Sequence, residues 1–503
     1  MHIDNFPSRA FKGFDWSENS KVAVFIHGLF AEYTVWYKQG ESKKRIRDST
    51  KIQQHLTHFV LEAYRTFKAS PDYLIGIHLG NSYYNSKTRY KPNHLSFRIV
   101  INVTQFLTAA GYLERPLGNS GWAPNKEDRR TTRFQATPKL IEAMDKHGIN
   151  RFMIVPFPEA PPETIILRKA KKAQQSGVME DYCETPFTLQ ARRSLDTINR
   201  FIAKHCINLD ISNNQEVALQ HNDRYIDFTK TSLKRIFNNS SFEEGGRFYG
   251  GWWQQIPSDY RLFITINSKR TVQLDYSGMY FAIMYAAMNE SMPMEDPYAL
   301  QGYSSHLRGD IKTASNIIIN CRTPNEAINT IDSRIASGKL STELGTGQKL
   351  LERFTQTHPL IKDKIASGDG VRGQFIDSQI AEKVLLKGIS LNLCILPIHD
   401  GFITTKGDQH LLLSIMKKSF REVTDAATMI KPESFNLSVL DNDKGDDYWI
   451  TRLDNTQQFN GPLEGKAIAY AQAISKESLW KSFYFGNDKA RTRLMDWDTA
   501  NNV

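Results

Sequence analysis

Two aspartates occupy positions where a carboxylate would be held rigidly and would still be reachable by solvent. Residues 271–275, TVQLD, are β-prone and end at Asp275. Residues 391–405, LNLCILPIHDGFITT, contain an apolar run that ends at Asp400, where the following glycine permits a tight turn into a returning strand. Two carboxylates at neighbouring strand ends can hold two divalent cations about 4 Å apart, an arrangement that catalyses nucleotidyl transfer. Taken singly, each aspartate is also compatible with a turn or cap residue.

A basic helical face lies between the two aspartates in the sequence. Residues 304–320 read SSHLRGDIKTASNIIIN, a spacing that predicts a helix with Arg308 and Lys312 on one face. Asn316 and Asn320 continue the same face. Two cations so arranged could bind the triphosphate of an incoming nucleotide. An isolated pair of this kind is more often a solvated basic face, so its position between the aspartates is what gives it weight.

The N-terminal part of the chain has the element order of a winged helix. A basic cluster at residues 43–51 leads into a helical pattern over residues 52–69, and a second helix is expected over residues 96–111. Residues 112–114 and 133–136 then read as two strands around a polar loop, and a Thr-Pro pair begins a third helix.

The polar face of the middle helix in this pattern would carry Arg98, Asn102 and Gln105. Such side chains can contact base edges in duplex DNA. The alternative is that they form a solvated face of a helical domain without a ligand.

The composition indicates a folded, basic protein. The chain has 503 residues, of which 40% are hydrophobic, and 64 Lys and Arg against 54 Asp and Glu give a net charge of +10, which favours polyanions. The four cysteines are far apart without a CxxC pair, so neither a disulfide framework nor a cysteine-built zinc site is expected. An apolar signal-peptide core is missing from the start of the chain, and no long apolar run follows. These features predict a cytoplasmic protein without a membrane partner.

Residues 246–400 resemble the polymerase domain of family A DNA polymerases, the DNA polymerase I type, and more distantly the bacteriophage-type single-subunit RNA polymerases. Three motifs of that family have counterparts in the family's order: Asp275, Tyr276 and Ser277 for motif A, Arg308 and Lys312 for motif B, and His399 and Asp400 for motif C. Upstream, elements that contact primer and template in the family are matched by Gly246, Arg247, Gln254, Gln255, Ile256 and Pro257. Each motif is short, but the ordered set is fairly specific.

The resemblance implies a role for each matched residue. Asp275 and Asp400 would bind two Mg²⁺ or Mn²⁺ ions, with help from the main-chain carbonyl of Tyr276. Lys312 and Arg308 would contact the triphosphate. The primer terminus and the nucleic acid would be contacted by His399, Arg247 and Gln254.

At three positions the sequence departs from the family pattern. Tyr280 stands where motif A has glutamate, Asn316 where motif B has an aromatic residue, and Gly401 where the family's DNA polymerases have glutamate. In the family the first two positions influence sugar selection, so the choice between deoxy- and ribonucleotides stays open. A bulky Tyr280 could still exclude a 2′-hydroxyl sterically, and Gly401 removes a third carboxylate while the two essential ones remain.

We therefore predict an α+β chain with a right-hand polymerase architecture, in which an antiparallel palm sheet carries helical fingers and a helical thumb. The predicted divisions are a basic N-terminal region with the winged helix (1–149), a helical connector or thumb (150–240), the palm and fingers (241–428) and an accessory segment (429–503). The expected activity is DNA-directed DNA synthesis from nucleoside triphosphates on primer-template DNA, without proofreading because no DxE set precedes residue 240.

Two other functions stay open at this point. One is a replication initiator or regulator in which the winged helix binds duplex DNA and the palm is degenerate. The other is a single-subunit RNA polymerase. In each of the three cases the basic clusters would supply salt-dependent contacts with phosphates.

Overall fold

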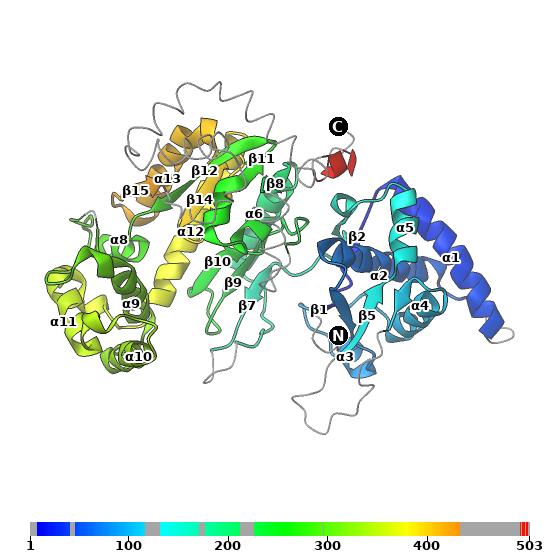
Figure 1. Cartoon of the computed structure of the whole chain (residues 1–503), viewed down its shortest axis with the longest axis horizontal. Coiled ribbons are helices and arrows are strands. Elements are labelled where there is room, and N and C mark those ends of the chain that lie inside the picture. Colours follow the sequence, from blue (N-terminus) through cyan, green and yellow to red (C-terminus); the bar gives the residue numbers. More distant parts are fainter. Residues whose placement is uncertain are drawn as a thin grey trace. The chain divides into compact units, whose positions relative to one another are not determined.

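The computed structural model describes residues 8–40, 46–115, 131–170, 177–211, 226–294, 296–432, 493, 495–497 and 499–500. The chain divides into two compact units (Figure 1): unit 1 is Met1–Glu163, Ile211–Lys230 and Phe485–Val503, and unit 2 is Thr164–Asp210 and Thr231–Tyr484. Several predicted features lie outside the described residues. They are residues 43–45 of the basic cluster, the loop between the two N-terminal strands and nearly all of residues 433–503.

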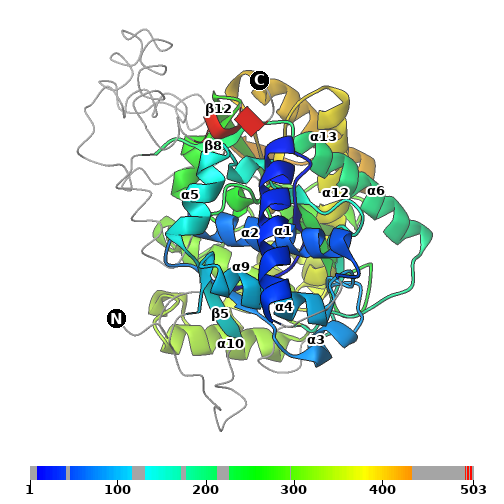
Figure 2. The same ribbon diagram turned by 90° about the vertical axis from the view of Figure 1, so that its right-hand side faces the viewer.

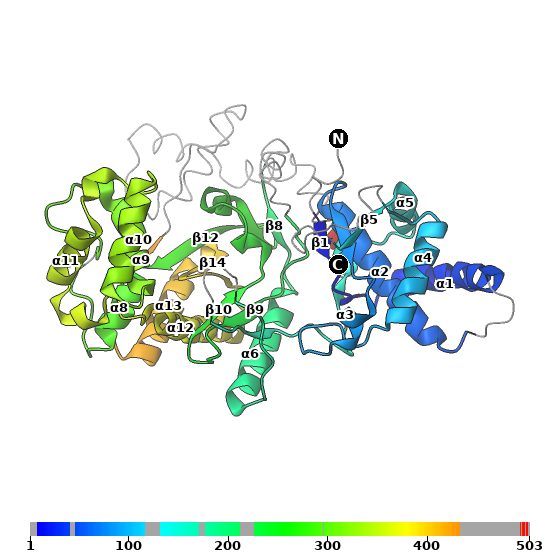
Figure 3. The same ribbon diagram turned by 90° about the horizontal axis from the view of Figure 1, so that it is seen from below.

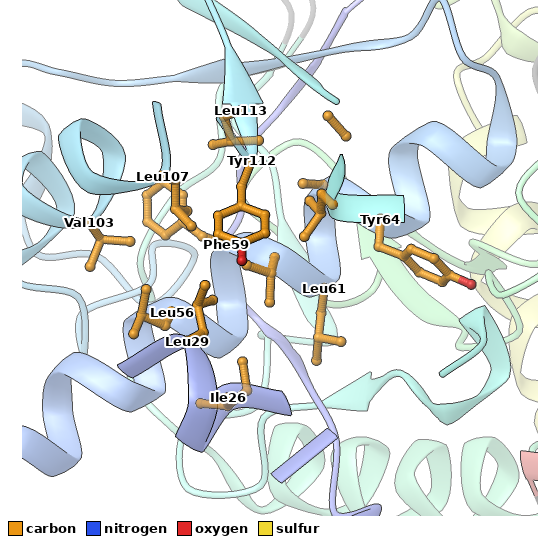
Figure 4. Close-up of a cluster of buried hydrophobic side chains, with 14 of the residues drawn as sticks. Ile26, Leu29, Leu56, Phe59, Leu61, Tyr64, Val103, Leu107, Tyr112 and Leu113 are labelled. Carbon is orange, nitrogen blue, oxygen red and sulfur yellow. The ribbon is translucent and has the colours of Figure 1, made fainter. Parts of the chain in front are cut away.

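The helices of unit 1 surround one hydrophobic core. Among its described helices are α1 (Ser20–Gly40), α2 (Ser49–Ala69), α3 (Asn81–Asn85), α4 (Phe97–Ala109) and α5 (Pro138–Lys146). The Asp48 side chain caps the start of α2 by accepting from the amide of Lys51. Helix α1, for which the pattern predicted no element, crosses α2 (Figure 2). Figure 4 shows side chains of α1, α2 and α4 meeting in this core, among them Leu29, Phe59 and Leu107.

The sheet of unit 1 has the strand order β1-β3-β5-β4. Its strands are β1 (Ser8–Ala10), β3 (Leu74–Ile77), β4 (Leu113–Glu114) and β5 (Thr132–Ala136), and a separate pair is formed by β2 (Asp15–Trp16) and β6 (Val155–Pro156). Strand β5 is antiparallel to both β3 and β4. The helix predicted over residues 96–111, the two strands after it and the helix that begins at Pro138 are therefore confirmed.

The described part of unit 2 contains two sheets. The larger is antiparallel and runs β13-β14-β12-β11-β8, with β15 paired to β12; its strands are β8 (Ile207–Leu209), β11 (Ile264–Ile266), β12 (Lys269–Tyr276), β13 (Leu396–Ile398), β14 (Gly401–Thr405) and β15 (Ile430–Pro432). The smaller consists of β7 (Ile165–Leu167), β9 (Lys234–Phe237) and β10 (Gly245–Tyr249). Strand β12 is central, because it pairs with β11, β14 and β15.

The helices of unit 2 form two groups. Helices α6 (Pro186–Ile202), α12 (Gly370–Ser390) and α13 (Gln409–Thr424) pack on the sheets. The second group has a hydrophobic core of its own and lies to one side of the sheets (Figure 3); it consists of α8 (Met279–Ala286), α9 (Arg308–Asn320), α10 (Pro324–Ala336) and α11 (Gly347–Thr357). The described chain is thus a mixed α/β structure, as predicted. No helix within the described ranges is long and apolar enough to cross a bilayer.

The expectation that residues 150–240 are mostly helical is wrong for the described part of that segment. Helix α6 is the one α-helix in that described part. Strands β7 and β9 belong to the smaller sheet, and β8 belongs to the larger one. Strands β7 and β8 are short, largely apolar runs and β9 has only four residues, and periodicity alone cannot distinguish such short runs from a piece of buried helix. Strand β8 pairs with β11, and one side of β9 pairs with β10. Both partners come later in the chain, so strand pairing decides that these segments are extended.

Candidate active site

Strand β12 and the hairpin β13–β14 bring Asp275 and Asp400 together. Asp275 is opposite Gly401 in the antiparallel register of β12 and β14. The amide of Tyr276 donates a hydrogen bond of 3.1 Å to the carbonyl oxygen of Asp400. The turn between β13 and β14 consists of His399 and Asp400, and both aspartates are only partly buried. The two carboxylates predicted from the sequence therefore lie on adjacent strand ends of one sheet.

Gly401 leaves room for the carboxylate of Asp275. A Cβ atom at position 401 would lie 1.7 Å from Oδ1 of Asp275 and 2.8 Å from its Cγ. The buried side chain of Gln273 donates from Nε2 to both carboxylate oxygens of Asp275, over 3.0 and 3.2 Å. Gln273 thus holds the Asp275 carboxylate over β14. Gly401, which departs from the family pattern, is the residue that leaves space for it.

The turn that follows Asp275 is held from two sides. Gly278 has a φ of 57°, and a Cβ atom there would lie 2.5 Å from Cγ of Pro297. The hydroxyl of Tyr276 donates to the carbonyl of Met416 on α13 over 2.7 Å. Main chain at the end of β12 is therefore fixed between α13 and the loop at residues 296–298, which suits a site that uses a main-chain oxygen as a ligand.

An ion pair between β10 and α12 lies beside the hairpin. Nε of Arg247 is 2.5 Å from Oδ2 of Asp377, and the guanidinium carbon is 5.4 Å from the ring centre of Tyr280. Burial raises the pKa of Asp377 to about 6, while Arg247 opposes that shift and Asp400 adds to it. A small pocket at this place is lined by Arg247, Phe248, Asp377, Ser378, Ala381, Pro397 and His399. Asp377 was not predicted from the sequence, where it is one acidic residue in an amphipathic helix.

Helix α12 is fixed against β9 and β10 by the buried Arg235. Its guanidinium donates to the carbonyl of Gly246 over 2.9 Å, to the hydroxyl of Ser378 over 2.9 Å and to the carboxylate of Glu382 over 2.7 Å. Because Ser378 follows Asp377 directly, these bonds also define where the Asp377 carboxylate lies.

The side chain of Gln254 is engaged within the protein. Its amide nitrogen donates to the carbonyls of Phe248 and Pro397, each over 3.0 Å, and its oxygen accepts from the amide of Gly250 over 2.9 Å. These bonds brace the loop after β10 against β13. The predicted contact of Gln254 with nucleic acid, which would compete with them, stays a prediction.

The N-terminal end of α9 contacts the loop at residues 296–298. Arg308 forms a bidentate pair with Asp296, with distances of 2.6 and 3.1 Å, and its guanidinium carbon is 5.4 Å from the ring centre of Tyr298. Burial raises the pKa of Tyr298 to about 12, with the charge of Asp400 adding to the shift and that of Arg308 opposing it. Tyr298 is therefore within the electrostatic range of both Arg308 and Asp400.

The exposed face of α9 continues toward α12. Lys312 and Asn316 are exposed on it, and the side-chain oxygen of Asn320 is 3.5 Å from Nε2 of Gln374 on α12. Within the described part of the chain, the ammonium group of Lys312 has no hydrogen-bond or ion-pair partner. The predicted basic face thus contacts the loop at residues 296–298 at one end and α12 at the other.

The donor set at the two aspartates fits a hard cation that substrate and water would complete. In the described residues there is no group of three or more His, Cys, Asp or Glu side chains that could hold a metal ion. Mg²⁺ is commonly bound through one or two carboxylates together with substrate phosphates and water. Asp275 and Asp400 match that mode, whereas a structural zinc site would need four protein ligands.

Comparisons with known proteins give no assignment. No protein-family model matches the chain, and no curated protein matches its sequence. Among solved structures, the chain is similar to the POL domain of Pol1 from M. smegmatis in complex with DNA primer-template and dNTP, at 12% identity and a TM-score of 0.27. That match covers 76% of this chain and 68% of the other. A likeness this distant supports no statement about function, which must be argued from the site itself.

Proposed function

We propose that the protein is a template-directed nucleotidyltransferase, specifically a DNA-directed DNA polymerase without proofreading that uses two divalent cations. One observation carries the proposal: Asp275 and Asp400 lie on adjacent strand ends, while α9 carries Arg308 and Lys312 on one exposed face and begins at the loop of Tyr298, a residue within the electrostatic range of Asp400. A metal-dependent reaction of a triphosphate requires paired carboxylates for the metal ions and positively charged side chains for the phosphates.

Each residue has a role in this reaction. Asp275, Asp400 and the carbonyl of Tyr276 would hold Mg²⁺ or Mn²⁺, which when bound lower the pKa of the primer 3′-hydroxyl and neutralise the leaving pyrophosphate. Lys312 would contact the triphosphate as a point charge. Arg308 would do so after it leaves Asp296; the pair is exposed, and such pairs contribute only about 0–1 kcal/mol.

The remaining predicted contacts concern nucleic acid. His399 is exposed directly beside Asp400 and would support the primer terminus. Arg247 uses Nε for Asp377, so its two terminal amino groups stay available for primer or template. Gln254 would act mainly by bracing the loop that follows β10.

The proposed architecture assigns the larger sheet with α12 and α13 to a palm and helices α8 to α11 to reduced fingers. Within residues 150–240, helix α6 would belong to a thumb or connector, because β8 is part of the larger sheet; residues 429–503 would form an accessory segment apart from β15, which pairs with β12. Unit 1 would be a winged helix that binds duplex DNA. Its α4 carries Arg98 and Gln105 exposed and Asn102 half-buried, which suits contacts with base edges or phosphates.

Primer extension tests the proposal. The full chain would be incubated with a primed template, with Mg²⁺ or Mn²⁺, and with deoxy- and ribonucleotides in parallel reactions. We expect templated extension with deoxynucleotides. Extension with ribonucleotides alone would instead establish an RNA polymerase. Absence of synthesis on every primed and unprimed template would reject both assignments.

A second candidate function is a DNA-binding replication initiator or regulator, favoured by the helix–strand–helix–hairpin order of unit 1 and by exposed Arg98 and Gln105. It predicts sequence-specific binding to duplex DNA without metal-dependent synthesis. The polymerase assignment predicts preference for primer-template junctions with little dependence on sequence. Binding competition between random duplexes and primed junctions separates the two.

Replacement of Lys312 with alanine is expected to weaken nucleotide use. The change removes a charge that would contact the leaving phosphates, so KM for the nucleotide should rise about tenfold, with a smaller fall in kcat. Steady-state extension of a single nucleotide measures both constants. Lys349→Ala on α11, which removes an exposed lysine from the same group of helices, is the matched control. An unchanged KM in the Lys312 variant would contradict the assignment.

Replacement of Tyr280 with alanine is expected to relax sugar selection. The ring is confined, because a Cβ atom at Gly373 would lie 3.0 Å from its Cδ1 and Arg247 lies over its face. Removal of this fixed bulk should raise ribonucleotide relative to deoxynucleotide incorporation about tenfold. Tyr280→Phe keeps the ring and should keep the selection. Equal ratios in the wild type and the alanine variant would eliminate the steric role.

A further inference from the structure

Arg247 carries a charge that could interfere with a cation site. Burial by itself would lower the pKa of Arg247, but Asp377, followed by Tyr280 and Asp400, raises it above its ordinary value. Asp400 is therefore the second carboxylate whose charge reaches this guanidinium. Arg247 also lines the same small pocket as His399, the residue before Asp400, and an arginine beside a proposed metal ligand would compete with a cation for that carboxylate.

The geometry directs Arg247 to Asp377 instead. The Asp377 side chain is 2% exposed and the Arg247 side chain 15% exposed, so the pair is largely desolvated, which makes a lone charge at either position costly. Asp377 cannot easily move, because Arg235 holds the adjacent Ser378 and, one turn further, Glu382. Arg247 cannot easily retreat either, because the preceding Gly246 has a φ of 80° and a Cβ atom there would lie 2.9 Å from Oγ of Ser378.

We propose that Asp377 is a positioning residue that neutralises Arg247 and keeps it from pairing with Asp400, so that the carboxylates of Asp275 and Asp400 stay available to divalent cations. The inference rests on the cation site of the proposed function. Asp377 touches no cation in this arrangement and acts only through Arg247. It supplies a negative charge near a site where the family A DNA polymerases have a glutamate and this chain has Gly401. That charge comes from α12 and acts through Arg247.

Removal of the Asp377 charge should therefore release Arg247 toward Asp400. Asp377→Asn keeps the size of the side chain and leaves the guanidinium without its counter-ion in a half-buried position. The next carboxylate in range is Asp400, and pairing there would displace a cation. In the double variant Asp377→Asn, Arg247→Gln both charges are gone, and the competition disappears with them.

Mn²⁺ binding to the full chain, followed by electron paramagnetic resonance of free Mn²⁺ and by calorimetry, tests this without reference to catalysis. We expect Asp377→Asn to weaken Mn²⁺ binding roughly tenfold, and the double variant to restore it to within about twofold of the wild type. Arg247→Gln alone should bind Mn²⁺ as tightly as the wild type or more tightly. Asp377→Glu, which retains the charge, should bind like the wild type.

Two results would overturn the inference. One is wild-type Mn²⁺ affinity in Asp377→Asn, and the other is weakened binding in Arg247→Gln, which would mean that the arginine supports the cation site. If Asp377→Asn does not fold, Arg247→Gln and Asp377→Glu still decide the matter.

Failure of the proposed function gives a different result. A wild type that binds Mn²⁺ no better than the Asp275→Ala, Asp400→Ala double variant lacks the cation site, and the inference falls with it. A wild type that binds Mn²⁺ but extends no primer rejects the polymerase and leaves the role of Asp377 to be judged by the variants above.

Discussion

Replacement of Asp275 or Asp400 with asparagine is expected to lower primer extension by about a thousandfold or more. Asparagine has nearly the same shape as aspartate, so the β12–β14 register and the Tyr276–Asp400 main-chain hydrogen bond should persist. What is lost is the negative charge that would bind the cations, and without them the primer hydroxyl is a poor nucleophile. Single-turnover extension with Mg²⁺ measures the loss.

The controls for this experiment separate catalysis from folding. Asp363→Asn changes an exposed aspartate of unit 2 that lies after α11, and it should leave extension unchanged. Circular dichroism and binding of primer-template should be the same in the wild type and in both variants. Synthesis that survives in either the Asp275 or the Asp400 variant would contradict the two-cation assignment, whichever metal is supplied.

Replacement of Gly401 with alanine is expected to be nearly as damaging, although it removes no functional group. The new Cβ atom would lie 1.7 Å from Oδ1 of Asp275, and 3.2 Å from the carbonyl oxygen of Leu274, which belongs to the main chain. Either the Asp275 carboxylate leaves its bonds with Gln273 or the two strands separate. We expect extension to fall about a hundredfold, with a loss of about 1–3 kcal/mol in the free energy of unfolding.

Gly407→Ala is the matched control for that substitution. Gly407 follows β14 in the 3-10 helix Lys406–Asp408, and no atom lies within 4 Å of a Cβ built there. It should therefore change neither extension nor stability measurably. Mn²⁺ binding distinguishes the two ways in which Gly401→Ala could act, because a displaced Asp275 weakens it even if the fold is intact. A Gly401→Ala variant with wild-type extension would show that the Asp275 carboxylate need not lie over β14.

The local structure around the site was predictable from the sequence. The β-prone run that ends at Asp275, the apolar run that ends at Asp400 and the polar face of residues 308–320 all appear as strand, hairpin and helix in the predicted places. Each depends on neighbouring residues: a period of two or of 3.6, and glycine where a turn needs it. The nearness of Asp275 and Asp400 was a hypothesis, since the chemistry considered needs two carboxylates at neighbouring strand ends, and the pairing of β12 with β14 brings them together.

Four features of the site could not be found in this way. The partner of Arg247 is Asp377, which is 130 residues later, and the partner of Arg235 is Glu382, which is 147 residues later. The hydrogen bonds from Gln273 to Asp275 depend on how a buried strand residue is oriented, and the need for Gly401 depends on what lies across the strand. No local pattern marks Asp377, Glu382 or Gln273, and for Arg247 and Gly401 the sequence does not show which residue lies opposite.

The sequence by itself determined the elements and the chemical groups that they carry, because turns, caps and periodicity act over a few residues. The tertiary structure decided which groups meet. Strands β8 and β9 took extended form in a segment expected to be helical because they pair with β11 and β10, and β7 pairs in turn with β9. Asp377 became part of the site because it is buried next to Arg247, and an ion pair there has a much lower free energy than two separate desolvated charges. Both outcomes depend on partners distant in the chain, and the free energy of such contacts exists only once the fold has assembled.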